Sequence, residues 1–194
     1  MIIQLATKTD ALQIAQIHQQ EVNQGFLSQL GINFLTKLYQ AMIDFSLTFI
    51  VVAKEHNQIT GFVSGCTDLN KFYHYFLKKY FFSTCFILLP KIFQISILKK
   101  IAEILKYKNT KNNLPKAELL TLAVLQEFQG QGVAQILLTE FNKEMRKRGI
   151  KKFKVVVGER LPRAIAFYEK MGFKSHSTVS IHQDQSSKIY TYTL

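Results

Sequence analysis

The sequence predicts a mixed α/β fold, in which a sheet is flanked by helices. β-rich runs and segments of helical period alternate along most of the chain, and glycine or proline residues separate them. The length of 194 residues suits one domain of ordinary size, or one domain that carries an insertion. Hydrophobic residues make up 47% of the chain, which is enough for a substantial core.

Residues 1–66 predict the elements that open the sheet. In chain order these are a strand at 2–6, a helix between Asp10 and Gly25, a helix at 32–43, and a hairpin of strands at 48–55 and 59–66. Thr9 and Asp10 are plausible N-cap residues for the first helix, and Gly25 closes it. The second helix places four apolar residues on one face: Leu35, Leu38, Tyr39 and Met42.

The segment 68–116 differs from the rest of the chain in composition. It is rich in aromatic residues and lysine, and mostly helical in period, with an apolar stripe from Ile92 to Leu105. Its ten lysines and two acidic residues give it +8 of the chain's formal net charge of +12. Charge of this sign favours a polyanionic partner: a phosphorylated small molecule, a nucleic acid or an anionic membrane surface.

Alternation of strand and helix resumes at Ala117. The expected elements are a strand at 117–125, a helix that ends at Gly149, a strand at 151–159, a short helix within 161–173 and a closing hairpin at 177–194 that turns at 183–186. Gly149 is a suitable residue just beyond a helix end. Pro162 falls in the first turn of the short helix, where a missing N–H is tolerated, and Gly172 ends that helix.

Several classes of protein are disfavoured by the sequence. Cys66 and Cys85 are the only cysteines, and neither they nor the five histidines show metal-ligand spacing, so no metal is expected. The N-terminus lacks the pattern of a signal peptide. The longest uncharged apolar stretch near the middle, residues 80–90, is about half of what a membrane span needs. A soluble, cytoplasmic protein is therefore expected.

Gly130 and Gly132 stand directly in front of an amphipathic helical run. Glycine in a helix interior costs about 0.5–1 kcal/mol, so two glycines at a helix start indicate a required backbone shape. A strand that runs through residues 129–134 into a helix presents several free N–H groups at the positive end of the helix dipole. Such a turn binds phosphate, and glycine lets a pyrophosphate approach the main chain. A purely structural turn is the alternative.

Two other phosphate-binding motifs do not fit this turn. A dinucleotide-binding fingerprint needs a third glycine and a downstream acid, and the third glycine is missing. A P-loop needs Gly-Lys-Ser/Thr, which is also absent.

The motifs around the turn closely resemble those of the GNAT superfamily of N-acetyltransferases. The family signature is Q/R-x-x-G-x-G/A at the start of the central helix, followed by a tyrosine in an FYEKxGF segment. Both occur here, as QGQGVA at 129–134 and FYEKMGF at 167–173. The resemblance is strong over residues 117–173 and looser over 1–66. It implies a single GNAT domain over 1–194, with a mixed, mostly antiparallel sheet, splayed central strands, flanking helices and a mainly helical, lysine-rich insertion at about 68–116.

By this resemblance, acetyl-coenzyme A (acetyl-CoA) is the expected cosubstrate. Backbone amides of Gln129–Ala134 would bind its pyrophosphate, and the main chain of Leu122–Val124 would pair with the pantetheine arm and hold the thioester oxygen. Leu161 stands where many family members carry an asparagine, and leucine cannot make that side-chain hydrogen bond. The expected cofactor-binding residues are Leu122, Ala123, Val124, Gln129, Gly130, Gln131, Gly132, Val133, Ala134, Leu161, Ala164, Phe167 and Tyr168.

The implied reaction is direct acyl transfer to a primary amine, which is mostly protonated at pH 7. Freeing an amine near the lysine reference pKa costs roughly 4 kcal/mol, which a base or a site that lowers the amine pKa must supply. Glu118 and Glu159 are the candidate bases, and for each a solvated surface carboxylate is the alternative. Tyr168 stands where family members carry a general-acid tyrosine; a core aromatic beside Phe167 is the alternative.

The expected acceptor is a primary amine of a small molecule, and the lysines of 68–116 favour a phosphorylated, amino-sugar-like one. The segment has three possible roles: a cap on the domain, a lid over the acceptor, or a surface for an anionic membrane. A protein or peptide is the alternative acceptor. A basic, non-catalytic protein that binds nucleic acid or a membrane surface is the alternative of another class, which the cofactor motifs disfavour. Monomer and homodimer both stay open.

Overall fold

The structure, a computed structural model, describes residues 1–23, 25–92, 114–182 and 185–194. In these ranges a seven-stranded sheet has the order β1-β2-β3-β4-β5-β7-β6. All neighbours are antiparallel except β4 and β5, which run parallel, so the mixed, mostly antiparallel sheet is confirmed. The strands are β1 (Ile2–Leu5), β2 (Thr48–Glu55), β3 (Gln58–Cys66), β4 (Glu118–Val124), β5 (Lys152–Gly158), β6 (Lys174–His182) and β7 (Gln185–Thr193).

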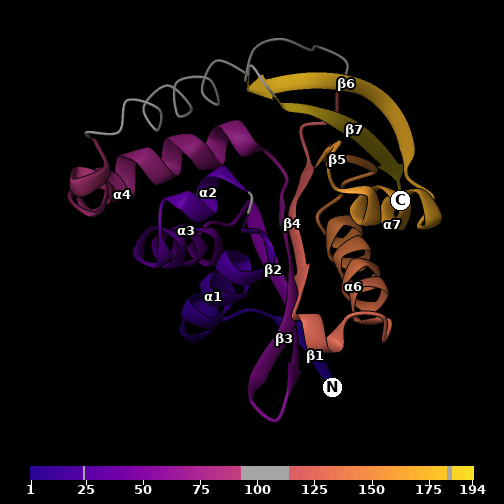
Figure 1. The fold of residues 1–194 in the computed structure, drawn as a ribbon, viewed down its shortest axis with the longest axis horizontal. Coiled ribbons are helices and arrows are strands. Elements are labelled where there is room, and N and C mark those ends of the chain that lie inside the picture. The colour runs from indigo at the N-terminus through magenta and orange to yellow at the C-terminus, as the bar shows by residue number, and fades with distance from the viewer. Residues whose placement is uncertain (24, 93–113, 183–184) are drawn as a thin grey trace.

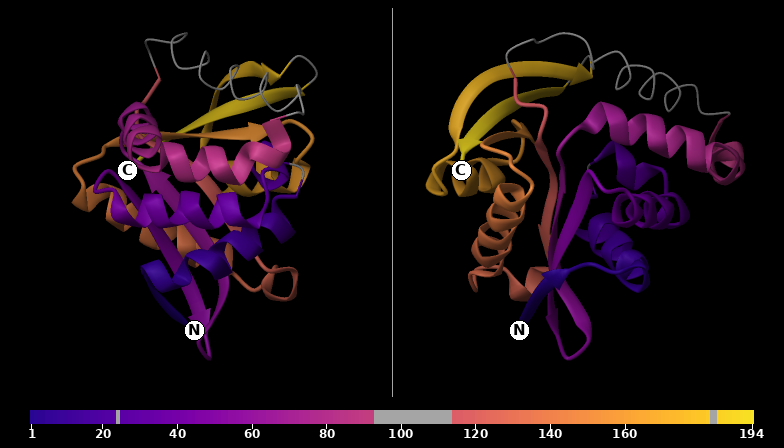
Figure 2. Two further views of the ribbon diagram at one scale, coloured as in Figure 1. Left: turned by 90° about the vertical axis from the view of Figure 1, so that its left-hand side faces the viewer. Right: turned by 180° about the vertical axis from the view of Figure 1, so that it is seen from behind.

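Helices cover both faces of this sheet (Figures 1 and 2). On one face lie α1 (Ala11–Glu21), α2 (Phe26–Gln29), α3 (Ile32–Asp44) and α4 (Leu69–Ile92), and on the other lie α6 (Val133–Lys147) and α7 (Pro162–Lys170). The short turns η1 (Lys8–Asp10) and η3 (Gln126–Phe128) precede α1 and the glycine turn. Each face of the sheet buries its own cluster of apolar side chains against its helices.

The elements predicted from the sequence form close to the expected positions. The hairpin turn between β2 and β3 places His56 and Asn57 at positive φ, 45° and 69°, a conformation that asparagine tolerates well. The helix α2 is the exception, because four residues are too few to show a helical period. The turn predicted at 183–186 lies partly outside the described residues, although β6 and β7 pair on both sides of it.

The structure describes only part of the predicted insertion at about 68–116. Residues 69–92 form α4, so this part is helical. The apolar stripe predicted from Ile92 to Leu105 lies, beyond Ile92, outside the described residues. Of the helices in the described ranges, none is long and apolar enough to cross a membrane.

Ring contacts and an ion pair hold α4 against α3. Phe45, which follows α3, stacks on Tyr75 with the ring centroids 4.5 Å apart. The Lys79 ammonium donates to the Tyr75 hydroxyl at 2.9 Å and lies 3.4 Å from Oδ2 of Asp44 at the end of α3. Lys79 therefore links two helices, while its side chain stays 49% exposed.

The central strands β4 and β5 are splayed, as predicted. Residues 118–119 of β4 pair with residues 154–155 of β5, and no later pair joins the two strands in the described part of the chain. On its other side β4 stays paired with β3 as far as Val124, with a bulge that leaves Leu120 without an opposite residue. From Leu120 onward, the edge of β4 that faces β5 has no strand partner among the described residues.

Candidate active site

The glycine turn between β4 and α6 has the backbone shape that its sequence predicts. Gly130 and Gly132 both have positive φ, 78° and 82°, which favours glycine strongly. A Cβ atom added to Gly130 would meet nothing within 4 Å, and one added to Gly132 would meet only Oε1 of Gln135, at 3.8 Å. The protein leaves this space open, and the N-terminus of α6 points at it from Val133.

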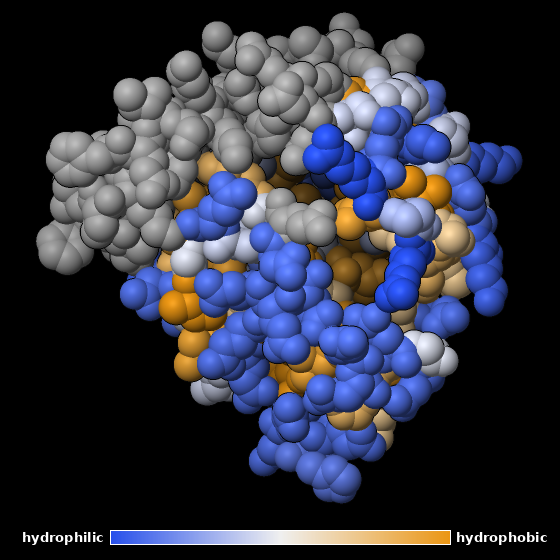
Figure 3. All heavy atoms as spheres, viewed as in Figure 1, coloured by the Kyte–Doolittle hydropathy of each residue, from blue (hydrophilic) through white to orange (hydrophobic). Residues whose placement is uncertain are grey.

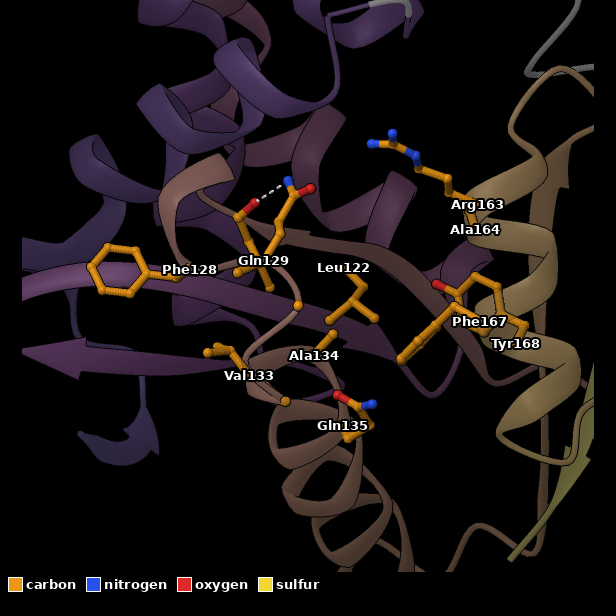
Figure 4. Close-up of a pocket in the computed structure, with 13 residues that line it drawn as sticks. Leu122, Phe128, Gln129, Val133, Ala134, Gln135, Arg163, Ala164, Phe167 and Tyr168 are labelled. Atoms are coloured by element: carbon orange, nitrogen blue, oxygen red, sulfur yellow. Dashed lines mark hydrogen bonds between the residues drawn. The ribbon is translucent and has the colours of Figure 1, made fainter.

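Side-chain hydrogen bonds fix the turn to the strand and to α1. The Gln129 amide donates to the Val124 carbonyl at 2.9 Å (Figure 4) and to Oε2 of Glu21 at 3.2 Å. The other oxygen of Glu21 accepts from the backbone N–H of Gln126 at 3.3 Å. Glu21 lies more than one hundred residues earlier in the chain, so no local sequence signal could have indicated this contact.

A cavity of about 330 Å³ opens between the glycine turn, β4 and α7 (Figure 4). A space-filling view from the direction of Figure 1 shows a hollow with a hydrophobic floor and a largely hydrophilic rim (Figure 3). The cavity is lined by Leu122, Val124, Phe128, Gln129, Gly130, Gly132, Val133, Ala134, Gln135, Arg163, Ala164, Phe167 and Tyr168.

Most residues predicted to bind the cofactor line this cavity, but three do not. The side chain of Ala123 is buried on the opposite face of the sheet, although its main chain runs between two lining residues. The Gln131 amide turns back to the Glu127 carbonyl at 2.8 Å. Leu161 is 44% exposed and does not line the cavity.

Three lining residues were not predicted: Phe128, Gln135 and Arg163. Arg163 precedes Phe167 by four residues on α7, so helical periodicity could have placed both on the cavity side. Figure 4 shows its guanidinium extending from α7 toward the Gln129 side of the cavity. The arginine adds a positive charge to a cavity whose other lining side chains carry none.

Tyr168 combines the two roles weighed for it from the sequence. Its ring is packed in the core, with centroids 5.4 Å from Phe167 and 5.0 Å from Phe173, and the residue is 6% exposed. It also lines the cavity, where Figure 4 shows it extending from α7 toward β4. Burial raises the pKa of its phenol further above neutrality, so the hydroxyl is a proton donor at pH 7.

Glu118 is not the solvated surface carboxylate that was the alternative for it. It lies in the short stretch where β4 and β5 still pair, its side chain is 12% exposed, and its Oε2 lies 3.1 Å from Nζ of Lys154. The Lys154 ammonium also donates to the Pro115 carbonyl at 2.7 Å. Burial raises the pKa of the Glu118 carboxyl, and the charge and hydrogen bond of Lys154 oppose that rise.

Glu159 lies in the exposed loop that follows β5. Its N–H donates to the Ser186 carbonyl at 3.1 Å, and its carboxylate accepts a hydrogen bond from the Ser186 hydroxyl. Both contacts connect this loop to the β6–β7 hairpin. The structure brings Tyr168 together with the predicted cofactor residues, whereas neither Glu159 nor Glu118 lines the cavity.

Comparison with known families identifies the arrangement of sheet, turn and cavity. The sequence profile of the Acetyltransferase (GNAT) family matches residues 16–173. The chain belongs to this family. Comparison with curated protein sequences gave no match.

Solved structures share the fold at low sequence identity. A ribosomal-protein-alanine N-acetyltransferase from Brucella melitensis has a TM-score of 0.65 at 14% identity, over 100% of both chains. The PaiA N-acetyltransferase from Thermoplasma acidophilum, in complex with coenzyme A, has a TM-score of 0.62 at 17% identity, over 100% of both chains. An aminoglycoside 6′-acetyltransferase type Ii has a TM-score of 0.64 at 14% identity, over 100% of this chain and 97% of its own.

This GNAT chain is therefore an acetyl-CoA-dependent N-acetyltransferase. The residues present fit the cosubstrate, because the two glycines leave room at a helix N-terminus and β4 offers an edge without a strand partner. Among the described residues, no group of three histidine, cysteine, aspartate or glutamate side chains could hold a metal ion.

Proposed function

We propose that this GNAT enzyme transfers the acetyl group of acetyl-CoA directly to the primary amine of a small molecule. The observation that carries this proposal is the cavity, which joins the glycine turn, the open edge of β4 and the Tyr168 side chain. A cosubstrate lying along β4 would have its pyrophosphate at the start of α6 and its thioester near α7. An amine that enters between the splayed strands then meets the thioester without any protein-bound intermediate.

The burial of Cys66 argues against a route through an acyl group carried on that cysteine. Cys66 is completely buried at the end of β3, and burial raises the pKa of its thiol to about 12. An acyl-carrying cysteine must reach the thioester as a thiolate. Cys66 meets neither requirement.

The cofactor contacts divide between backbone and side chain. Backbone amides from Gln129 to Ala134 bind the pyrophosphate, and the open edge of β4 from Leu122 to Val124 pairs with the pantetheine arm. An amide of this edge donates to the thioester oxygen, where a hydrogen bond strengthens as negative charge develops. Arg163 adds a cation on the α7 side of the cavity, suited to a coenzyme phosphate. Leu161 contributes at most an apolar contact at the rim.

The amine has to lose a proton before it attacks. Glu118 is the better placed of the two carboxylates, because it lies two residues before β4 separates from β5 and burial raises its pKa. Lys154 holds it at 3.1 Å, so a water or the acceptor itself has to reach the remaining carboxylate oxygen. Glu159 is the second candidate, on the exposed loop beyond β5.

Tyr168 acts at the other end of the reaction, as the general acid. Its phenol remains protonated at neutral pH and faces the cavity, so it can donate to the sulfur as the thiolate of coenzyme A leaves. The packing of its ring against Phe167 and Phe173 holds the hydroxyl in a fixed direction.

The class of acceptor is the least constrained part of the proposal. Similar structures are named for the alanine of a ribosomal protein and for an aminoglycoside, so the shared fold does not choose between a peptide and a small molecule. The net charge of +12 supports an anionic acceptor, such as a phosphorylated amino sugar. A protein or peptide N-terminus is the second candidate, supported by the first of these similarities.

The remaining parts of the proposal concern the protein as a whole. We treat residues 1–194 as one cytoplasmic GNAT domain, with 68–116 as an insertion that shapes the acceptor side or lies on an anionic membrane surface. Binding of nucleic acid is disfavoured, because the cavity and turn serve a small cosubstrate. Either a monomer or a homodimer is compatible with one complete cavity in each chain.

Two measurements test this function. Acetyl-CoA should raise the melting temperature, since a ligand that binds only the folded state stabilises it. Release of free thiol from acetyl-CoA should then be followed across amino sugars with and without phosphate, polyamines, aminoglycosides and peptide N-termini. A thermal shift without turnover of any acceptor would leave the cofactor site standing and overturn the proposed acceptor class. The absence of any thermal shift would overturn the cofactor site itself.

A further inference from the structure

A buried polar chain crosses the core on the face opposite the cofactor cavity. His18 of α1 and Tyr39 of α3 are 2% and 1% exposed, and Nδ1 of His18 lies 2.5 Å from the Tyr39 hydroxyl. The side chain of Thr121 on β4 lies close enough to the same hydroxyl to interact with it. These three residues, called here the His18–Tyr39–Thr121 chain, link two helices to the strand that carries the cofactor edge.

Thr121 lies on β4 between the bulge and the first residue of the strand that lines the cavity. It follows Leu120, the bulged residue, and precedes Leu122, which lines the cavity from the other face. The bulge also lies where the pairing of β4 with β5 ends, at Leu119. A contact that holds the Thr121 side chain therefore fixes the rotation of the strand at the start of the open edge.

The chain holds geometry and does not carry protons. Burial lowers the pKa of His18 to about 4, so its imidazole is neutral at pH 7. Burial raises the pKa of the Tyr39 phenol, and the interaction with the Thr121 side chain opposes this only in part. Neither group changes its charge near neutral pH, which leaves positioning as the role that the contacts support.

The stability of the fold does not explain this polar chain well. Nε2 of His18 is buried and has no hydrogen-bond partner among the described residues, and the same holds for the hydroxyl of Ser64, which lies opposite Thr121 on β3. Buried polar atoms without partners cost free energy that apolar side chains of similar size would not. The surrounding core is apolar: Phe62 packs edge-on against Tyr39 at 5.4 Å.

We propose that the His18–Tyr39–Thr121 chain positions the bulge of β4, so that a backbone N–H of the open edge points at the thioester oxygen. His18 and Tyr39 would thus be positioning residues for acetyl transfer, although they lie on the helices across the sheet from the cavity. This inference rests on the proposed function, in which that edge binds the thioester. It predicts that loss of the chain weakens polarisation of the thioester more than it weakens cofactor binding, most of which is made by the glycine turn.

The test follows the thioester carbonyl itself and needs no acceptor. Acetyl-CoA labelled with ¹³C at the carbonyl is bound to saturation, and its carbonyl resonance is compared with that of free acetyl-CoA. A hydrogen bond from β4 moves the resonance downfield in the wild-type enzyme. Tyr39→Phe and Thr121→Val, which remove hydroxyl groups with little change in volume, should lose about half of this displacement or more, while the Kd of acetyl-CoA changes less than about threefold.

Two matched variants serve as controls. Thr121→Ser keeps the hydroxyl and should retain the wild-type displacement. Tyr190→Phe makes the same change in another buried tyrosine, whose hydroxyl bonds Glu169 on α7, and should also retain it. Circular dichroism and thermal melts establish that each variant is folded; if Tyr39→Phe is not, the pair Thr121→Val and Thr121→Ser decides.

An unchanged displacement in both Tyr39→Phe and Thr121→Val would overturn the inference and reduce the chain to packing. Equal losses of displacement in Tyr190→Phe would also overturn it, because the effect would then be unspecific. If wild-type enzyme binds acetyl-CoA but shows no displacement, the inference fails and the cofactor site stands. If it binds no acetyl-CoA, the proposed function fails and the inference fails with it.

Discussion

The two faces of the sheet differ in how their functional residues come together. On the α6–α7 face, the cofactor cavity is built almost entirely from residues 122–168, a contiguous part of the chain. On the α1–α4 face, contacts join residues that are far apart, such as His18 with Tyr39 and Lys79 with Asp44. A site made from adjacent residues leaves a motif in the sequence, whereas a site made from distant contacts leaves none.

The difference extends to the kind of chemical group that each face uses. The cofactor side relies on backbone N–H groups and a glycine conformation, which change little with the identity of neighbouring side chains. The opposite face relies on side chains, namely Glu21, His18 and Tyr39, whose roles depend on tertiary packing. Backbone recognition suits a cosubstrate shared by the whole family, whereas the side-chain contacts of the opposite face belong to the packing of this particular chain.

The largest expected effect is on acetyl-CoA affinity, and it comes from a substitution on the cofactor face of the sheet. Gly132→Asp places a side chain and a negative charge in the space for the pyrophosphate, at φ 82°. We expect a loss of affinity for acetyl-CoA of about 100-fold or more, since both the strain and the charge oppose binding. Isothermal titration calorimetry measures this, and the thermal shift by acetyl-CoA should disappear.

Gly149→Asp is the matched control for that variant. Gly149 also has a positive φ, 73°, and open space around its Cβ position, but it lies at the far end of α6. Its substitution should lower stability through the same strain and leave the Kd of acetyl-CoA unchanged. Equal binding by wild type and Gly132→Asp would refute an anion site at the glycine turn.

The next effect concerns chemistry within the cofactor face. Tyr168→Phe removes the proposed acid and keeps the ring that packs against Phe173, so we expect kcat to fall by about 10²–10⁴ with little change in the Kd of acetyl-CoA. Steady-state kinetics with an acceptor found in the screen provide the measurement. Tyr190→Phe is the control and should change kcat less than about threefold. Unchanged turnover in Tyr168→Phe would leave the tyrosine a purely structural role.

Much of the fold and of the cofactor site could be predicted from the sequence. The strands and longer helices follow from periodicity, and the turn follows from two glycines and the residues after them. Phe128, Gln135 and Arg163 were missed, although Phe128 and Gln135 adjoin the motif at 129–134 and helical spacing would have placed Arg163. The splay of β4 and β5 was expected only through family resemblance, because nothing in the local pattern of either strand says where pairing ends.

The contacts on the α1–α4 face could not be predicted to the same depth, for a physical reason. From the sequence, a solvated surface carboxylate was the alternative role for Glu118. The structure buries this carboxylate beside Lys154, and only tertiary structure brings these two residues together. Glu21, His18 and Tyr39 carry no motif at all. Long-range side-chain contacts depend on how whole helices and strands pack. Sequence periodicity predicts which face of a helix is buried, but it does not predict which residue of another element that face contacts.

A further prediction uses pH to examine the α1–α4 face alone. The pKa of His18 is lowered by burial from 6.5 to about 4, so the unfolded state takes up a proton first as the pH falls. The free energy of unfolding should therefore be unaffected by His18 above pH 6.5 and should fall between pH 6.5 and about 4, by up to about 3 kcal/mol. Urea unfolding across this range measures the slope.

His18→Phe keeps an aromatic ring and removes the titrating imidazole. The free energy of unfolding of this variant should therefore lose this part of its pH dependence, whether the variant is more or less stable than wild type. His176→Gln, an exposed histidine on β6, is the control and should keep the wild-type slope. If His18→Phe retains the slope in full, His18 is not the buried group responsible. The same pH change should alter the free energy of acetyl-CoA binding less than it alters the free energy of unfolding, because the cavity lies on the other face of the sheet.

The smallest expected effect concerns the exposed lysines of α4. Lys79 is unsuitable for a charge reversal, because the reversed charge would repel Asp44 and disturb the contact between α4 and α3. Lys71 and Lys78 are exposed, and their double reversal to glutamate should raise the KM of a phosphorylated acceptor by about two- to tenfold at low salt. Added salt should reduce the difference between wild type and variant, while the thermal shift by acetyl-CoA stays unchanged. The double variant Lys143→Glu/Lys147→Glu makes the same charge change on α6, across the sheet, and should leave the KM of the acceptor unchanged.

The same α4 variant also tests the membrane role. If vesicles rich in phosphatidylserine bind wild type and not the α4 variant, at equal turnover, the lysines serve a membrane surface. If neither property changes, the lysines of α4 only keep it solvated, and acceptor recognition has to lie elsewhere on that face.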